Sequence, residues 1–319
     1  MFELDTKAPP LNYMKIFQFA VNLAIFWEIM FLLQILHSKF EIIKENAAYF
    51  ALVMVLVFII GLIIVLIRSI MKIEKNRTGF LGILFNIIIS PFGKVRFKHV
   101  ILADIITSMI KMLNDFHLTL FFIFQGCWLH NETPENEYLP RIEIICLFFP
   151  LFWRFNQNIN KLMETRKANP FLLNMGKYFS GMVYVTINSY FMLIDHEKDL
   201  RFIAIIAHII VTMYSYLWDV IKDWGLFKTK SKHFLLKDNL LYPRKFYYFA
   251  LVTNFVLRFI WTSLLIPQTY FLNNYFEGHF IIYILASLEV FRRSQWVLLR
   301  TEHEAGTQLP NLPTSLKLY

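Results

Sequence analysis

Five cationic side chains lie within segments of the sequence that are otherwise strongly apolar. They come from four separate segments and are Arg154, Lys177, Arg258, Arg292 and Arg293. For any one of them, an ion pair that only fixes packing explains the charge as well as a site does, because charges at membrane depth usually face one another or a water-filled path. Together, the five positive charges are more than a neutral network of ion pairs requires. Guanidinium groups also bind phosphate-like oxyanions through paired hydrogen bonds. The set therefore predicts a buried anion-binding site.

Carboxylates and hydroxyls accompany these cations at helical spacing. Residues three, four or seven apart share a helix face, so Glu289 faces the same way as the arginine pair and Asp219 the same way as Asp223. A further stripe consists of Asp104, Thr107, Ser108, Lys111 and Asp115. Such carboxylates would hold the arginines in place and accept hydrogen bonds from a protonated oxyanion such as dihydrogen phosphate. Fully deprotonated sulfate is disfavoured for the same reason.

The elements that must position these residues are membrane-spanning helices. Of the 319 residues, 57% are hydrophobic and only 17% are charged, a composition from which no water-soluble surface can be built. The apolar runs are long and do not alternate, and a helix of roughly 20 apolar residues crosses a membrane. We predict an all-α, polytopic transmembrane helical bundle of about eight spans: 13–37, 47–68, 99–125, 141–160, 179–195, 201–221, 246–268 and 279–299. The shorter stretch 80–92 is predicted to be re-entrant or to lie on the membrane surface.

Basic residues fall on alternate loops of this bundle. The loops after the second, fourth and sixth spans are rich in Lys and Arg, and the opposite loops are poor in them. Because Lys and Arg accumulate on the cytosolic side, we predict that both termini are cytosolic, and the net charge of +9 requires no nucleic acid partner. The glycosylation sequon at Asn131 falls in a predicted luminal loop, which agrees. Cys127 and Cys146 are predicted to be packing residues, in neither a disulfide nor a metal site.

Several motifs, in a fixed order between residues 91 and 304, resemble those of the EXS family. They are Asp104 with Thr107, Trp153-Arg154-Phe155, Gly176-Lys177-Tyr178, Trp218-Asp219, Asp223-Trp224-Gly225, Leu241-Tyr242-Pro243, Arg258 with Trp261, Glu289 with Arg292-Arg293, and Arg300 to Glu304. The resemblance implies an N-terminal transmembrane hairpin and membrane-surface segment at 1–92, an EXS transmembrane domain of the last six spans at 93–304, and a cytosolic tail at 305–319. The polar run from Asn156 to Asn160 departs from the larger relatives, so the outer part of the path is expected to differ.

The resemblance implies a phosphate exporter related to the xenotropic and polytropic retrovirus receptor. Larger members have an SPX domain before the membrane part, and this chain, with no room for one, resembles most the short fungal ER-retention-defective type of the Golgi. That type implies a multi-pass Golgi protein that moves inorganic phosphate from the lumen to the cytosol, supporting glycosylation and retention of ER luminal proteins. By motif position the implied phosphate-binding residues are Asp104, Thr107, Arg154, Lys177, Tyr178, Asp219, Asp223, Arg258, Trp261, Glu289, Arg292 and Arg293. Among them, Tyr178 and Trp261 would line or gate the path, and Glu289 would orient the arginines.

Two other classes of function stay open at this point. A non-transporting Golgi scaffold would use the basic cytosolic loops to hold coat or retention factors near anionic lipid headgroups. An intramembrane enzyme would use Asp219 and Asp223 as metal ligands, but the arginines beside them and the lack of a nucleophile motif argue against it. We therefore expect no enzymatic activity and no cofactor. The expected partners are inorganic phosphate and membrane lipid, with a homodimer and Golgi retention or coat factors as further candidates.

Overall fold

The computed structural model describes residues 80–126 without 91 and 94, 139–193, 198–265 without 230, and 275–308, with isolated positions between 21 and 64. The chain forms two compact units, one of residues 82–114 and 137–319 with Met1, the other of residues 2–81 and 115–136. The predicted spans 13–37 and 47–68 and the Asn131 sequon lie largely or wholly outside the described residues. All the predicted site residues belong to the first unit.

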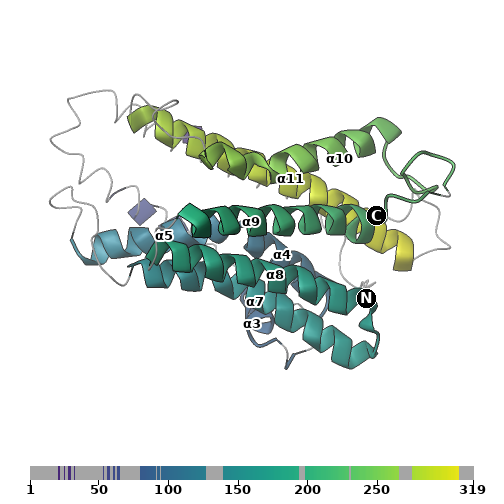
Figure 1. Ribbon diagram of the computed structural model, residues 1–319, viewed down its shortest axis with the longest axis horizontal. Helices are drawn as coiled ribbons and strands as arrows, with labels where there is room; N and C mark the ends of the chain where they lie inside the picture. Colours follow the sequence, from purple (N-terminus) through teal and green to yellow (C-terminus); the bar gives the residue numbers. More distant parts are fainter. Residues whose placement is uncertain are drawn as a thin grey trace. The chain divides into compact units, whose positions relative to one another are not determined.

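Every element in the described part of the chain is a helix, which confirms the predicted all-α class (Figure 1). In chain order the elements are α3 (Phe80–Ile88), α4 (Phe97–Ser108), α5 (Ile110–Phe124), α7 (Leu139–Thr165), α8 (Ala168–Leu193), α9 (Lys198–Trp218), the π-helical turn η2 (Asp219–Asp223), α10 (Arg244–Arg258), the 3₁₀ turn η3 (Ile260–Leu265) and α11 (Tyr275–Gln308). Among the described helices, the stretch Arg201–Asp223 is long and apolar enough to cross a membrane by itself. The number of spans stays a prediction.

The predicted segment 99–125 forms two helices, and the prediction of a single continuous one is wrong. The helices α4 and α5 divide at Met109, which has φ −93° and ψ 14° and donates its N–H to the carbonyl of Ile106, three residues back. A three-residue bond of this kind closes a 3₁₀ turn and interrupts the α-helical register. The predicted polar stripe from Asp104 to Asp115 is therefore broken, with its first three members on α4 and its last two on α5.

The helices α7, α8 and α9 pack as consecutive neighbours (Figure 1). α7 ends at Thr165, and the next residue, Arg166, has a positive φ of 57°, as is common directly after a helix C-terminus. α8 begins two residues after Arg166. α8 thus starts well before the predicted segment 179–195, which places Lys177 and Tyr178 inside the helix instead of at its start. α4 packs against α7, and α11 packs against α10, α4 and η2. These contacts bring the helices with predicted site residues together.

Burial in the first unit is the reverse of that in a water-soluble protein. The charged residues Arg154, Asp219 and Arg292 are only 4%, 2% and 5% exposed, whereas Phe179 and Phe202 are 55% and 64% exposed. Charged groups in soluble proteins almost never lie fully inside unless paired. A bundle that faces lipid with its outer surface and encloses a polar interior accounts for both observations.

An apolar cluster anchors the segment between η2 and α10 to the bundle. Trp224, Leu236, Tyr247, Trp296 and Leu299 are all buried together. They come from the segment itself, from α10 and from α11. Large aromatic side chains in such a cluster contribute most of the apolar area buried. The cluster therefore fixes the end of η2, and with it the two aspartates that η2 contains.

Gly225 makes the close approach between η2 and α11 feasible. Its φ of 64° is in the left-handed region, and the next N–H, of Leu226, bonds to the carbonyl of Val220 at 2.9 Å. This is the geometry in which glycine commonly ends a helix. The imidazole of His303 lies directly against the glycine, so that a Cβ added there would be 2.7 Å from its Nδ1.

We expect Gly225→Ala to lower the stability of the protein by about 2–4 kcal/mol, because the new methyl group overlaps His303 and keeps a strained positive φ. Thermal unfolding in detergent measures this as a lower Tm. The double variant Gly225→Ala with His303→Ala should recover the stability lost through the overlap but not the stability lost through the positive φ. A single Gly225→Ala variant as stable as the wild type would contradict this geometry.

Candidate anion-binding site

α4, α7 and α8 meet at a buried ion pair. Arg154 of α7 binds Asp104 of α4 through two parallel hydrogen bonds, 2.7 Å from Nε to Oδ1 and 3.1 Å from Nη2 to Oδ2. Tyr178 of α8 donates its hydroxyl to Oδ1 of Asp104 at 2.6 Å and accepts from Nε of Arg154 at 3.0 Å. Bidentate, charge-assisted bonds of this kind are among the strong ones in proteins. Arg154 is therefore engaged by the protein itself.

Buried amides complete the surroundings of Arg154. Gln157 accepts a hydrogen bond from Nη1 at 2.5 Å, and Asn158 donates to the backbone carbonyl of Arg154 at 2.7 Å. Asn174 of α8 donates to the side-chain oxygen of Asn158 at 2.9 Å, which ties α7 to α8. Sequence reasoning placed residues 156–160 at the outer part of the path and missed that Gln157 would be a partner of Arg154. Only the i, i+3 spacing of the two residues on one helix signalled the contact.

Asp219 gathers a second set of polar groups from α10 and α11. Arg258 donates to its Oδ2 from Nε at 3.1 Å and also from Nη2, and Asn254 donates to the same oxygen at 3.2 Å. Arg292 lies 3.9 Å from that oxygen, but its guanidinium fork binds Glu289, one turn earlier on α11, at 2.8 and 2.5 Å. Glu289 thus fixes the orientation of Arg292. Asn254 also belongs to this cluster, and nothing in the sequence had indicated it.

The π-helical turn η2 faces a row of residues on α11. Asp223 accepts a hydrogen bond from Nε1 of Trp296 at 3.0 Å and lies 3.6 Å from Nε of Arg300. Arg292, Trp296 and Arg300 are four residues apart, so they share one helix face. Single π turns inside helices often occur at functional sites. Here η2 presents both of its aspartates to α11, and Trp296 and Arg300 join the site without having been predicted for it.

Two of the five predicted cations have no carboxylate within ion-pairing distance among the described residues. The ammonium of Lys177 lies over the rings of Tyr178 and Trp218, 4.3 and 5.3 Å from their centroids. The guanidinium of Arg293 donates to the hydroxyl of Ser108, at 2.7 Å from Nε, and lies 4.8 Å from an indole centroid. Aromatic faces and hydroxyls stabilise a cation without neutralising it. Lys177 and Arg293 are therefore held without a direct ion pair among the described residues, although Asp104 and Asp219 lie near enough to act on both charges.

A pocket of about 370 Å³ leads to these ion pairs. Its lining includes three buried residues: Asp104 and Arg154, which pair with each other, and Asp223 of η2. It also includes four basic residues that are at least partly exposed: Arg96, Lys161, Lys222 and Arg300. The lining has five basic and three acidic side chains. Such an excess of positive charge raises the local concentration of anions.

Thr107 and Trp261 are placed differently from the ion-paired residues. The hydroxyl of Thr107 donates to the backbone carbonyl of Asp104 on its own helix, at 2.7 Å. Trp261 lies in η3, directly after α10, and its indole ring stacks on His208 of α9 with centroids 3.9 Å apart. The indole N–H is buried and has no hydrogen-bond partner.

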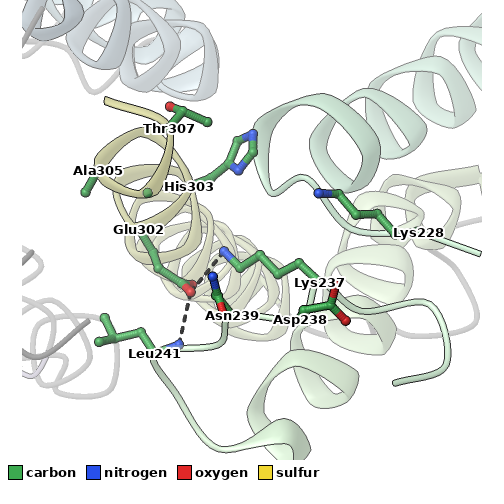
Figure 2. A pocket seen from close by; sticks show the side chains of 10 residues that line it. Lys228, Lys237, Asp238, Asn239, Leu241, Glu302, His303, Ala305 and Thr307 are labelled. Carbon is green, nitrogen blue, oxygen red and sulfur yellow. Dashed lines mark hydrogen bonds and ion pairs between the residues drawn. The ribbon is translucent and has the colours of Figure 1, made fainter. Parts of the chain in front are cut away.

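A second pocket, of about 240 Å³, lies between α11 and the segment before α10 (Figure 2). Figure 2 shows Glu302 joined to Lys237 and to the backbone of Leu241, with distances of 2.9 and 3.2 Å. The hydroxyl of Tyr247 also donates to Glu302, at 2.7 Å. The two lysines of this pocket are matched by Asp238 and Glu302, so it lacks the excess of positive charge of the first pocket.

We expect Asp104→Asn to destabilise the fold by about 3–5 kcal/mol, because it leaves the buried Arg154 without its counter-charge. Thermal unfolding in detergent measures the loss. Thr107→Ala is the control, because it removes a hydroxyl that bonds only within α4 and should cost about 1 kcal/mol. Equal stability of the two variants would contradict the importance assigned to this ion pair.

We expect stability to fall as the pH is lowered from about 6.5 towards 4, in part through His303. Burial first, and then the neighbouring Lys237 and Arg300, lower the pKa of His303 to about 4. The unfolded chain takes up this proton near pH 6.5, so below that pH the unfolded state binds more protons and gains stability relative to the folded one. The Tm between pH 7 and pH 5 should decline less in His303→Asn than in the wild type. Parallel declines would contradict the lowered pKa.

Comparison with known proteins places the chain in a family. The sequence pattern of the EXS family matches residues 1–306. The chain is 31% identical to the SPX and EXS domain-containing protein 1 of Dictyostelium discoideum over 95% of its own length. It is 29% identical to the phosphate transporter PHO1 of Arabidopsis thaliana over 92%, and 32% identical to solute carrier family 53 member 1 of Homo sapiens over 72%.

The chain covers 33%, 39% and 36% of these three relatives, so it spans between a third and two fifths of their length. The family match extends through the N-terminal segment, beyond the region 91–304 in which the motifs were recognised. The match agrees with the buried charges and the exposed apolar surface of the described helices. The chain, all-α in its described part, is a membrane protein and belongs to the EXS family.

Proposed function

We propose that this protein transports inorganic phosphate across a membrane, from the Golgi lumen to the cytosol. The observation on which the proposal rests is that two cations, Lys177 and Arg293, form no direct ion pair in the described part of the chain although they lie among buried carboxylates. A buried positive charge without a direct counter-ion is costly inside a bundle, which makes an anionic ligand the partner that best explains it. A scaffold acting through its surface loops would have no use for such an interior.

The chemistry of the site suits a partly protonated phosphate. Its charged oxygens would accept hydrogen bonds from Lys177 and Arg293, and its hydroxyls would donate to the carboxylates of Asp219 or Asp223. Arg258 and Arg292 are already held by Asp219 and Glu289, so they are oriented before the anion arrives. Sulfate is fully deprotonated at neutral pH, has no hydroxyl to donate, and would meet the carboxylates as an unfavourable charge.

We infer that the first pocket gives this site access to one end of the bundle, although its lining includes neither Lys177 nor Arg293. It reaches Asp104, Arg154 and Asp223 and continues past partly exposed basic side chains. The distribution of Lys and Arg in the loops supports a cytosolic position for that end. Release of phosphate into the cytosol would follow the basic wall, where each contact is exposed to water and therefore weak.

The Golgi assignment rests on the likeness to the short fungal type of EXS protein. In that setting the anion would be the phosphate that luminal glycosylation releases, and its return to the cytosol would sustain glycosylation and retention of ER luminal proteins. Two of the relatives are named as a phosphate transporter and a solute carrier, which supports transport and disfavours enzymatic activity. Loss of the protein should then raise luminal phosphate in the Golgi.

We expect Lys177→Met and Arg293→Met each to reduce phosphate flux at least about tenfold, because each removes a charged hydrogen bond to the anion, worth about 1.5–3 kcal/mol. The measurement is uptake of radioactive phosphate by proteoliposomes that contain the purified full chain. Lys167→Met is the matched control, because this lysine is exposed in the connection between α7 and α8. It should transport like the wild type.

Arg293→Lys separates charge from geometry, since lysine keeps the charge but not the guanidinium fork. It should retain more flux than Arg293→Met. Excess sulfate should inhibit phosphate uptake only weakly in the wild type. Undiminished flux in both methionine variants, with all variants folded by thermal unfolding, would refute the site; absence of phosphate flux in the wild type would refute the function.

A further inference from the structure

The segment between η2 and α10 holds one phenylalanine outward. Phe234 is 79% exposed, although Leu236, two residues later, is completely buried in the apolar cluster. The backbone N–H of Phe227 bonds to the carbonyl of Leu235 at 2.8 Å, which closes residues 227–235 into a loop. Leu235 has a φ of 59°, so the chain turns sharply directly after the phenylalanine. The ring is therefore presented by an ordered loop tip, and sequence analysis gave it no role.

Hydrogen bonds on both sides of Phe234 fix this loop tip. Tyr248 of α10 donates its hydroxyl to the backbone carbonyl of Phe234 at 2.8 Å. The backbone N–H of Lys232 donates to Oδ1 of Asp238, also at 2.8 Å. The loop tip is thus tied to the start of α10, and the phenylalanine ring cannot turn inward without breaking these bonds.

The contact with Tyr248 places the loop tip at the edge of an apolar face of α10. Phe249, Val252 and Val256 are all exposed, and at spacings of three and seven residues they share one side of that helix. Apolar surface of this extent is stable against lipid and not against water. A tyrosine, with its apolar ring and polar hydroxyl, is typical of the level at which lipid meets water. Phe234 therefore lies at that boundary.

Basic side chains accompany the phenylalanine at this boundary. Lys232 is exposed two residues before Phe234, and Arg244 and Lys245 are exposed in the first turn of α10. Arg244 and Lys245 precede Tyr248 by four and three residues, so they lie on the same side of the helix. In the described part of the chain none of these three cations forms an ion pair. We call the three cations together with Phe234 the tip patch.

The tip patch is separate from both pockets, since none of its residues lines either of them. Its positive charge therefore has no place in the route inferred for phosphate. The distribution of Lys and Arg in the loops predicts that this segment faces the cytosol. The cytosolic leaflet is the one that carries anionic lipids, and it attracts basic residues close to its surface. Cations at headgroup level beside an aromatic ring at the acyl boundary match the chemistry of that leaflet.

We propose that the tip patch docks on anionic lipid headgroups of the cytosolic leaflet. Phe234 enters the boundary between headgroups and acyl chains, and Lys232, Arg244 and Lys245 bind the anionic oxygens of the headgroups. An acidic protein is the other partner that suits three cations and a ring, but continuity with the exposed apolar face of α10 favours lipid. The proposal goes beyond the proposed function and does not depend on which ion the protein transports.

Fluorescence quenching in the full chain measures whether the loop tip enters lipid. An aromatic fluorophore is attached at Phe234→Cys in a background with Cys127→Ala and Cys146→Ala. The protein is reconstituted into vesicles of phosphatidylcholine with brominated acyl chains and increasing fractions of phosphatidylserine. Bromine quenches a fluorophore that enters the acyl region. A fluorophore at Phe179→Cys, on the exposed side of α8, is the matched control, and its quenching should not depend on lipid charge.

We expect the fluorophore at position 234 to be quenched in the presence of phosphatidylserine and to be quenched little without it. Lys232→Gln should move the dependence to about fivefold higher fractions of phosphatidylserine. The triple variant that adds Arg244→Gln and Lys245→Gln should lose the dependence. Lys167→Gln, an exposed lysine between α7 and α8, should leave it unchanged. Concentrated sodium chloride should also release the loop tip, because salt screens exposed charges.

Equal quenching at position 234 with and without phosphatidylserine would overturn the proposal, because the ring would then enter lipid without help from the cations. A fluorophore that stays unquenched in every vesicle would overturn it as well and would indicate an acidic partner protein. Thermal unfolding establishes that each variant is folded. The measurement involves no transport, so a failed docking test leaves the proposed function standing, and an absence of phosphate flux leaves the docking surface standing.

Discussion

A charge inside a helical bundle surrounded by lipid must find a counter-charge or a strong dipole within a few ångströms, and the described structure is organised by this requirement. Arg154 is satisfied by Asp104 and Gln157, and Arg258 by Asp219. Each pair joins two helices that are distant in sequence, so the electrostatic demand also fixes the packing. Lys177 and Arg293 are exceptions, stabilised by aromatic rings and a hydroxyl. These two exceptions are where we propose that an anion binds.

Backbone irregularities place the carboxylates where the cations need them. The π turn η2 presents Asp219 and Asp223 to the face of α11 that contains Arg292, Trp296 and Arg300. Gly225 lets the chain turn immediately afterwards, against α11. A regular helix continued through this region would carry the chain away from that helix. The π turn and the left-handed glycine therefore allow one short segment to place Asp219 beside Arg258 and Asp223 beside Trp296 and Arg300.

Sequence reasoning identified the helical class and most of the charged residues, because long apolar runs and buried charges are local signals. It did not identify partners such as Gln157, Asn254 and Arg300, since their roles depend on contacts between distant segments. The break at Met109 was missed because the helical spacing of the polar stripe from Asp104 to Asp115 continues across it and does not reveal a single 3₁₀ turn. His208, whose ring stacks on Trp261, was overlooked for a related reason: the sequence does not show which ring lies against a single histidine in an apolar helix.

The most direct test of this account is a structure of the full protein determined at saturating inorganic phosphate. The account predicts density for one tetrahedral anion within hydrogen-bonding distance of the Lys177 ammonium and the Arg293 guanidinium, with a carboxylate of η2 on its other side. Lys177 and Arg293 both without a bound anion under those conditions, or density for phosphate only on the basic wall of the pocket, would contradict it.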